Sequence, residues 1–384
     1  MLLREIVGLL DSWYDPRWAE PWDKVGLVCG DPDQQVRRIL FAVDPVESVV
    51  DEAVAYDADL VVVHHPLLLT PVSSVAATTA KGRVLHRLVR HGIALLTAHT
   101  NADVPEDGVN DAIARALGLQ DARVLEPTDG GGIDKVVVFA PVDVAEGLRA
   151  AIAGAGAGAI GAYDSATFTA RGEGRFRPLD GADPALGEVG ELEVVEEVRI
   201  ESVYPRPRRR AVVEALRAAH PYEEPAFDLI ELAEVPGGPL TGTGPAPTRG
   251  HGRVGRLSDA MTLRDFAAHV AGAFPRTAHG VRVAGDPERS VRTVAVGAGS
   301  GESLLEQARR TGADVFVTSD LKHHRASEFL EDGGPALVDI AHWAAEWSWL
   351  PVVAWKVDEA VAAAGDTVET RVSTTVTDPW TFRG

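Results

Sequence analysis

Apolar runs alternate with segments of helical spacing over roughly the first 125 residues of the chain. The apolar runs are rich in valine and nearly continuous, which is typical of strands buried on both faces. The amphipathic segments between them supply helices to cover those faces. This order predicts a parallel sheet within an α/β fold. We expect strands at 37–43, 59–65 and 93–99, and helices at 46–56, 80–92 and 108–119.

The pattern changes between about residue 130 and residue 235, where glycine becomes dense and the elements read β-α-β-β-α-β. This order predicts an α+β module inserted into the α/β fold. The stretch 235–252 is rich in glycine and proline and reads as a linker. We therefore divide the chain into an N-terminal half (1–128), an inserted domain (129–240) and a C-terminal half (241–384).

The opening pattern returns in the C-terminal half at a constant offset of 255 residues, where RRTGADVFVTSD matches VAYDADLVVVHH. Glu47 corresponds to Glu302, and Asp59 to Asp314. The general likeness of all βαβ units is the alternative explanation, and we favour an internal duplication. Ligands of open α/β sheets bind beyond the carboxyl ends of the strands. Two related halves that face each other would therefore bring two sets of strand ends to one cleft and form one core.

His64 and His65 end one of the valine-rich runs. Neighbouring strand residues point to opposite faces, so either one histidine is ordinary or the backbone bends and both converge. Other predicted strands also end near histidine and carboxylate residues, which bind zinc, manganese or iron. For a single residue, a surface turn is the alternative. The strand-end candidates are His64, His65, His99 and Asp103 in the first half, and Asp320, His323, His324, His342 and Glu346 in the second.

Local context bears on three of these candidates. His342 and Glu346 are four residues apart in AHWAAEW, so on a helix they share one face and suit one metal or a bridged pair. A helix turn with a solvated glutamate is the alternative, and Trp343 is expected to pack. Asp103 follows a strand in a polar stretch. Asp107 is better placed to cap the next helix, which leaves Asp103 free.

A glycine-rich run, GAGSGES at 297–303, follows a predicted strand and is expected to open a helix. Backbone N–H groups in such a position can hold a phosphate. The run lacks the lysine of a P-loop, so its pattern is incomplete. The candidate phosphate contacts are Gly297, Gly299, Ser300 and Gly301.

Composition bears on which partners the protein can bind and on the cell compartment in which it works. The formal net charge of -20 repels a phosphate backbone, so nucleic acid is an unfavourable partner. The single cysteine excludes an intrachain disulfide and fits a reducing compartment. The N-terminal segment reads as an amphipathic helix rather than a signal peptide. No apolar run approaches the ~20 residues of a membrane helix, and we expect a cytoplasmic protein.

Five motifs together resemble the Nif-three-like dinuclear metal proteins, whose members are commonly called GTP cyclohydrolase type 2 homologs. They are AEPWDKVGLVCGDP, VVVHHPLL, AHTNADVPEDGVNDAIA, TSDLKHH and DIAHWAAE, and the resemblance covers about 1–125 and 250–383. It implies a toroidal homohexamer of two-half subunits. AAHPYEEPAFDLIEL (218–232) resembles the hallmark of the PII and CutA-like insert of longer members. The implied ligands of two divalent ions are His64, His65, Asp103, His342 and Glu346.

This chain departs from the family pattern at Trp343, because AHWAAE stands where members commonly have a GHYATE-like run. The ligand spacing is kept.

Two divalent ions can share a water and lower its pKa towards about 7, which yields hydroxide as a nucleophile. Asp103 or Glu346 would bridge the ions, and His64 and His65 would bind different ions. This chemistry predicts a hydrolase acting on a nucleotide or other phosphorylated small molecule, GTP cyclohydrolase-like by resemblance. A non-catalytic metal- or ligand-binding regulatory protein and an assembly that metals only stabilise are the alternatives. The candidate catalytic or proton-transfer residues are Glu346, His99, Asp320 and His323.

Overall fold

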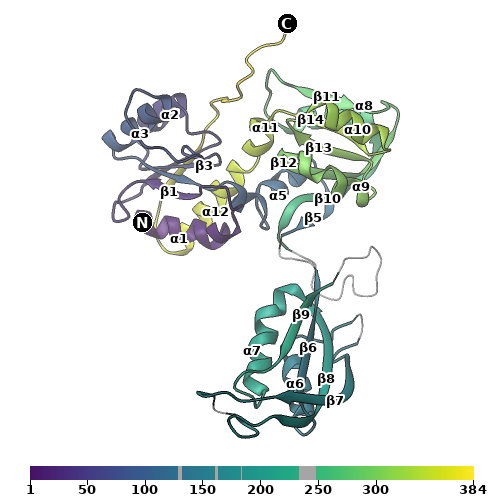
Figure 1. Cartoon of the computed structure of the whole chain (residues 1–384). Helices are drawn as coiled ribbons and strands as arrows, with labels where there is room; N and C mark the ends of the chain where they lie inside the picture. The colour runs from purple at the N-terminus through teal and green to yellow at the C-terminus, as the bar shows by residue number, and fades with distance from the viewer. Residues whose placement is uncertain (129–131, 161–162, 183, 233–247) are drawn as a thin grey trace. The chain divides into compact units, whose positions relative to one another are not determined.

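The computed structural model describes residues 1–128, 132–160, 163–182, 184–232 and 248–384. The chain divides into two compact units, 1–127 with 248–384 and 128–247 (Figure 1). The expected domain boundary at residue 240 and most of the expected linker, 235–247, lie outside the described residues. The last residues of that expected linker are not a linker, because β10 already begins at Gly250.

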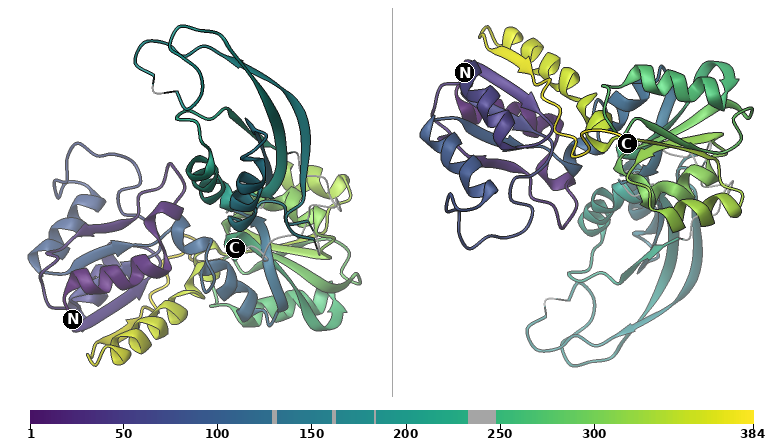
Figure 2. Two further views of the ribbon diagram at one scale, coloured as in Figure 1. Left: turned by 90° about the horizontal axis from the view of Figure 1, so that it is seen from below. Right: turned by 90° about the horizontal axis from the view of Figure 1, so that it is seen from above.

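The first sheet of the larger unit has the strand order β1-β4-β3-β2-β15. Its parallel strands are β2 (Arg38–Ala42), β3 (Leu60–Val63), β4 (Ala94–Thr97) and β15 (Glu369–Val372), and β1 (Gly26–Cys29) is an antiparallel edge. One face packs against α2 (Glu47–Tyr56) and α3 (Ala80–Arg90). The other packs against α1 (Leu3–Trp13) and α12 (Leu350–Ala363), which run along the same side of the sheet in Figure 2. The sheet is therefore buried on both faces, as its apolar strands predict.

The second sheet has the order β11-β14-β13-β12-β10-β5. Its parallel centre is β12 (Ser290–Ser300), β13 (Val315–Ser319) and β14 (Ala336–Ile340), and β11 (Val281–Ala284), β10 (Gly250–Thr262) and β5 (Gln120–Pro127) are antiparallel. One face packs against α9 (Leu305–Arg310) and α10 (His323–Glu331). The other packs against α5 (Val109–Ala116), α8 (Leu263–Ala273) and α11 (His342–Trp347). Each sheet thus has a purely parallel centre, with one antiparallel edge strand in the first sheet and antiparallel strands on both sides in the second.

The two halves exchange strands. β5 comes from the N-terminal part of the chain and pairs with β10 in the second sheet, while β15 comes from the C-terminal part and pairs with β2 in the first. A single hydrophobic core runs through both halves and includes α1, α5, α11 and α12. The halves therefore form one folding unit, and the site between them lies within that unit.

Matching contacts confirm that the halves are related. Gly30 and Gly285 both adopt positive φ angles, 133° and 145°, at the 255-residue offset. A Cβ on Gly30 would lie 2.5 Å from the Cβ of Ala94, and one on Gly285 would lie 2.9 Å from that of Ala336. Equivalent strands thus leave no room for a side chain at equivalent positions. The same offset relates two carboxylates, because Asp59 Oδ2 accepts from the amides of Arg37 and Arg38 and Asp314 Oδ2 from those of Arg292 and Thr293.

The smaller unit has the expected β-α-β-β-α-β order. Its antiparallel sheet is ordered β7-β8-β6-β9, and its helices pack on one face of it. The elements are β6 (Ile133–Pro141), α6 (Ala145–Gly154), β7 (Thr167–Phe176), β8 (Glu193–Pro205), α7 (Arg209–Ala219) and β9 (Phe227–Glu231). The fold class is therefore two related α/β halves with an inserted α+β unit. None of the described helices is both long and apolar enough to cross a membrane.

Candidate metal centre

His64 and His65 converge on one carboxylate. β3 ends at Val63, so both histidines follow the strand and do not alternate across it. His64 Nε2 lies 3.4 Å from Glu346 Oε1, and His65 Nε2 lies 2.9 Å from Glu346 Oε2. Of the two explanations for the histidine pair, the structure supports the one in which the backbone bends and both rings face the same site.

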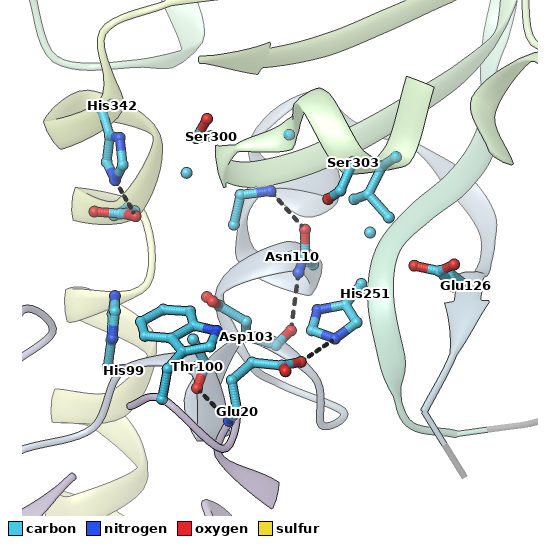
Figure 3. Close-up of a pocket in the computed structure, with 17 residues that line it drawn as sticks. Glu20, His99, Thr100, Asp103, Asn110, Glu126, His251, Ser300, Ser303 and His342 are labelled. Atoms are coloured by element: carbon cyan, nitrogen blue, oxygen red, sulfur yellow. Dashed lines mark hydrogen bonds and ion pairs between the residues drawn. The ribbon is translucent and has the colours of Figure 1, made fainter. Parts of the chain in front are cut away.

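Glu346 reaches this point from the C-terminal half. It lies one helical turn after His342 on α11, and His342 Nε2 is 2.8 Å from Glu346 Oε1 (Figure 3). Only 2% of Glu346 is exposed, because α11 packs into the core through Trp343. The alternative of a solvated glutamate is therefore excluded, and Trp343 packs as expected.

Asp103 completes the set of expected ligands. It is the last residue of the short helix α4 (Thr100–Asp103), rather than part of a loop, and its Oδ1 lies 3.8 Å from His64 Nε2. Asn110 donates to the Asp103 carbonyl and accepts the amide of Ala298, which ties this segment to β12 (Figure 3). The five expected ligands thus come together from both halves.

The expectation that Asp107 caps the next helix is wrong. Gly108, not Asp107, is the N-cap residue of α5, and no side chain caps it. Asp107 adopts a left-handed backbone conformation with φ 59°. Its carboxylate instead pairs with Arg115, 2.6 Å away. Asp103 is available for the site for a different reason, namely that α4 turns it inward.

A buried arginine fixes the chain that follows Asp103. Arg253 on β10 is 2% exposed. Its guanidinium donates to the carboxylate of Asp111 and to the carbonyls of Val104 and Pro105. This arginine therefore holds the α4–α5 connection against the second sheet.

Arg253→Ala is expected to lower the free energy of unfolding by about 3–5 kcal/mol, because it leaves a half-buried carboxylate and buried carbonyls without donors. Urea denaturation of the metal-free protein measures this effect. Arg256→Ala is the matched control, since Arg256 is exposed on the same strand and should change stability by no more than about 0.5 kcal/mol. Equal losses in both variants would contradict the assigned role of Arg253.

Each imidazole at the centre is held through Nδ1, which leaves Nε2 to face the site. Metal-binding histidines characteristically donate their second ring N–H to a carboxylate or carbonyl, which fixes the ring and its tautomer. The Nδ1 partners are Ala98 O for His64 (2.9 Å), Asp44 Oδ1 for His65 (2.7 Å), Asp23 Oδ1 for His99 (2.9 Å) and Asp320 Oδ2 for His342 (2.6 Å).

His99 is close enough to act as a ligand. Ligand atoms of His64, His65 and His99 lie within 4.8 Å of one another, as do those of His65, His342 and Glu346. Sequence reasoning gave His99 a proton-transfer role and left Asp23 and Asp44 out. Asp44 directly follows the strand at 37–43 and Asp23 lies within AEPWDK, so both stood in segments already singled out.

The charges at the centre depend on one another. The carboxylate of Glu346 raises the pKa of His342 to about 11. Burial lowers the pKa of His65, but Glu346 and Asp44 outweigh it and raise that pKa to about 10. Burial also disfavours the charged form of Glu346, yet His342, His65 and His64 hold its pKa well below the usual range.

Burial shifts the pKa values of two further groups at the centre in the direction that favours their neutral forms. Burial raises the pKa of Asp103 well above its usual range, and the nearby charge of Glu346 adds to the effect. Burial lowers the pKa of His64, which therefore keeps a lone pair for a ligand.

The residues present fit divalent metal ions. Three buried atoms have no hydrogen-bond partner, namely His64 Nε2, Asp103 Oδ1 and Glu346 Oε2. His65 Nε2 lies 2.9 Å from Glu346 Oε2 and is in contact with it. Buried polar atoms without a partner are unfavourable, and a cation at this point would satisfy all three. Imidazole and carboxylate donors suit zinc, manganese or iron.

The centre opens on a cavity of about 530 Å³. Asp103, His342 and Glu346 line it together with His99. Sequence reasoning missed several of the other lining residues, and His251 stood in the expected linker. The missed residues include Trp22 and three that Figure 3 labels, Glu20, Asn110 and His251.

The glycine-rich run at 297–303 borders this cavity, but its backbone differs from the expected strand-to-helix turn. Gly299, Ser300 and Gly301 line the cavity, whereas Gly297 is not among the lining residues that the structure describes. β12 continues to Ser300, and a 3-10 helix, η3 (Gly301–Leu304), follows it. The amide of Gly301 donates to the Thr318 hydroxyl, so it is not free for a phosphate.

Of the remaining two candidates, Asp320 lies at the centre and His323 does not. Asp320 accepts from His342 Nδ1, and this hydrogen bond lowers the pKa of Asp320. Asp320 therefore orients a candidate ligand. His323 begins α10 on the exposed surface, where its ring lies 5.2 Å from that of His324. The structure does not bring His323 to the centre.

Comparisons with known proteins cover nearly the whole chain. Residues 1–379 match the family model Duf34/NIF3 (NGG1p interacting factor 3). A protein of Mycobacterium tuberculosis named GTP cyclohydrolase 1 type 2 homolog is 46% identical over 98% of this chain and 96% of its own length. A protein of Bacillus subtilis with the same name is 38% identical over 99% and 98%.

Solved structures of similar proteins also match the chain over its length. A Bacillus cereus protein related to NIF3 is 39% identical, with a TM-score of 0.66 over 100% of this chain and 99% of that one. The Staphylococcus aureus protein SA1388 is 28% identical, with a TM-score of 0.68 over the same shares of the two chains.

Proposed function

We propose, from the premise that this chain belongs to the Duf34/NIF3 family, that it is a hydrolase that uses two divalent ions to act on a nucleotide or other phosphorylated small molecule. The observation that carries the proposal is the position of Glu346, whose two oxygens face His64, His65 and His342 beside a cavity of about 530 Å³. The name shared by the relatives makes GTP the first substrate to test.

His64, His65, Asp103, His342 and Glu346 would hold the ions. Bound there, the ions would supply an activated water and the positive charge that a phosphate needs. That charge matters because no lysine or arginine is among the described residues that line the cavity, while Glu20 and Glu126 are. A phosphorylated substrate would therefore place its phosphate beside the centre and its remaining part against the other wall.

His99 is the side chain best placed to move a proton. Asp23 accepts from its Nδ1, and His99 lines the cavity. With Nδ1 fixed, the exchangeable proton of the reaction would be carried at Nε2. Trp22 is 55% exposed and meets the His99 ring edge-on at 5.9 Å, so it offers an aromatic surface to a substrate ring. Asn110 is held by backbone on both sides and narrows the cavity next to Asp103.

The test loads the purified chain with manganese, zinc or iron, counts the bound ions, and assays GTP and a panel of phosphoesters. We expect turnover from the loaded wild type and a fall in kcat of about 10²–10⁴ in His99→Gln. His323→Gln is the control and should leave kcat unchanged, because His323 lies on the surface. The absence of turnover from a chain that holds two ions would reject the hydrolase proposal.

The inserted unit supports a second candidate, a ligand-binding regulatory protein. It contains a cavity of about 650 Å³ lined by Phe139, Phe176, Tyr222 and Glu197, among others. The hydroxyl of Tyr222 donates to Glu197 Oε1 at 3.1 Å. Burial is the larger cause and this hydrogen bond the smaller cause that together raise the pKa of Tyr222 to about 12. Binding of a small molecule to this unit without turnover at the metal centre would favour the regulatory candidate.

The homohexamer, the PII-like character of the insert and the cytoplasmic location remain predictions from the sequence and its family resemblance. Light scattering on the full chain tests the first of these, with a hexamer expected and a monomer contradicting it.

A further inference from the structure

A second cavity, of about 190 Å³, borders the metal centre. His65 and His342 line it and also face Glu346, so these two rings stand between the small cavity and the centre. Asp44 and Asp320, which hold the Nδ1 atoms of those rings, line it as well. Neither the hydrolysis proposed above nor its substrate cavity uses this space.

Asp378 gives this cavity a carboxylate oxygen without a partner. It lies in the C-terminal segment after β15 and lines the cavity, and only 9% of it is exposed. Its Oδ2 is buried and has no hydrogen-bond partner. An ionised carboxylate in such a place is unfavourable unless a cation or a donor pairs with it. No lysine or arginine is found among the described lining residues.

His279 adds a nitrogen donor. It lines the cavity, and its Nε2 lies 2.7 Å from Asp339 Oδ1, the same oxygen that Arg282 contacts at 2.8 Å. Because that carboxylate oxygen can only accept, Nε2 carries the proton and Nδ1 keeps its lone pair in the neutral ring. This is the carboxylate–imidazole arrangement that orients metal-binding histidines, with the two nitrogens exchanged relative to His65.

The size of the cavity and the spacing of its donors favour a cation that keeps its water. The groups whose ligand atoms lie within 4.8 Å of one another belong, among the described residues, to the main centre alone. The small cavity therefore does not offer three side-chain ligands at direct coordination distance. Its volume leaves room for several waters, and a small, hard ion such as Mg²⁺ releases its hydration water reluctantly.

We propose that this cavity is an additional divalent-cation site, in which Asp378, His279 and Asp320 hold a hydrated ion next to the ligand rings of the main centre. The site goes beyond the proposed hydrolysis and does not depend on it. Its negative charge comes from three carboxylates, Asp44, Asp320 and Asp378, of which the first two are already partly neutralised by His65 and His342. Asp378 is therefore the residue whose loss should affect this ion most and the main centre least.

The experiment is a Mn²⁺ titration of the full-length chain, followed by the electron paramagnetic resonance signal of free Mn²⁺. We expect the wild type to bind one ion per chain more weakly than the ions of the main centre. In Asp378→Asn this weaker ion should be lost or bound at least 10-fold less tightly, while the number of tightly bound ions stays the same. His279→Gln, a second variant on a different segment, should show the same selective loss.

Asp332→Asn controls for the loss of one negative charge, because Asp332 is exposed at the end of α10. It should bind both classes of ion as the wild type does. The proposal is overturned if Asp378→Asn binds the weaker ion as tightly as the wild type, or if Asp332→Asn loses it equally. A failure of the main centre has a different signature, namely tightly bound ions missing from the wild type itself.

Discussion

Glu346→Gln is expected to weaken the binding of divalent ions by more than 100-fold and to reduce the number of ions that remain after dialysis. The carboxylate of Glu346 contacts the Nε2 atoms of His64, His65 and His342 and is the one group that all three share. Loss of a residue that merely orients a ligand already costs about 10–100-fold in affinity, so loss of the shared ligand should cost more. Elemental analysis after dialysis against a weak chelator measures the effect.

The same substitution should destabilise the metal-free protein. Glutamine leaves the partly buried imidazoles of His65 and His342 without their anion. Breaking a fully buried pair costs about 3–5 kcal/mol, which sets the upper bound for this loss. Glu359→Gln is the control, since Glu359 is exposed on α12, and it should change neither metal content nor stability. Retention of the wild-type number of ions by Glu346→Gln would show that the centre has been assigned wrongly.

Binding of divalent ions to the metal-free protein at pH 7 is expected to release at least two protons per chain. His342, with its pKa raised to about 11 by Glu346, and His65, with its pKa of about 10, are both protonated at that pH. A metal ion needs the Nε2 lone pair and therefore displaces both protons. The apparent affinity should consequently rise by at least about 100-fold for each pH unit between roughly pH 6 and pH 8.

Calorimetry in buffers of different ionisation enthalpy counts the released protons. The raised histidine pKa values also stabilise the metal-free fold, fully below the usual histidine pKa of about 6.5, and that stabilisation is lost as the pH rises through 10 to 11. The metal-free protein should therefore lose stability over that range, and bound metal should suppress the loss. Ion binding without proton release would contradict the assignment of His65 and His342 as ligands.

Much of the fold could be predicted from the hydrophobic pattern, because strands buried on both faces require uniform apolar runs. The repeat at an offset of 255 residues predicted two related halves, and the paired positions Gly30 and Gly285 show why the likeness is more than general. The exchange of β5 and β15 between the sheets could not be predicted, since periodicity does not specify which edge a strand joins. The start of β10 at Gly250 was hidden by its glycines, which resemble a linker.

Part of the candidate site could likewise be predicted from the sequence, and part could not. The pair His342 and Glu346 follows from helical spacing alone, because four residues complete about one turn. The convergence of Asp103 on that pair depends on how two halves pack, and only the family resemblance supplied it in advance. Asp23 reaches His99 across 76 residues of sequence, and no local pattern encodes such a contact. Asp107 met the composition rule for a cap but sits in a left-handed turn that directs it to Arg115.

Anomalous X-ray scattering from crystals of the metal-loaded chain tests the central claim most directly. Two peaks per chain are expected in the space between His64, His65, Asp103, His342 and Glu346, with distances from metal to nitrogen or oxygen of about 2.0–2.2 Å. Strong peaks elsewhere in the chain, with none among these five side chains, would contradict it.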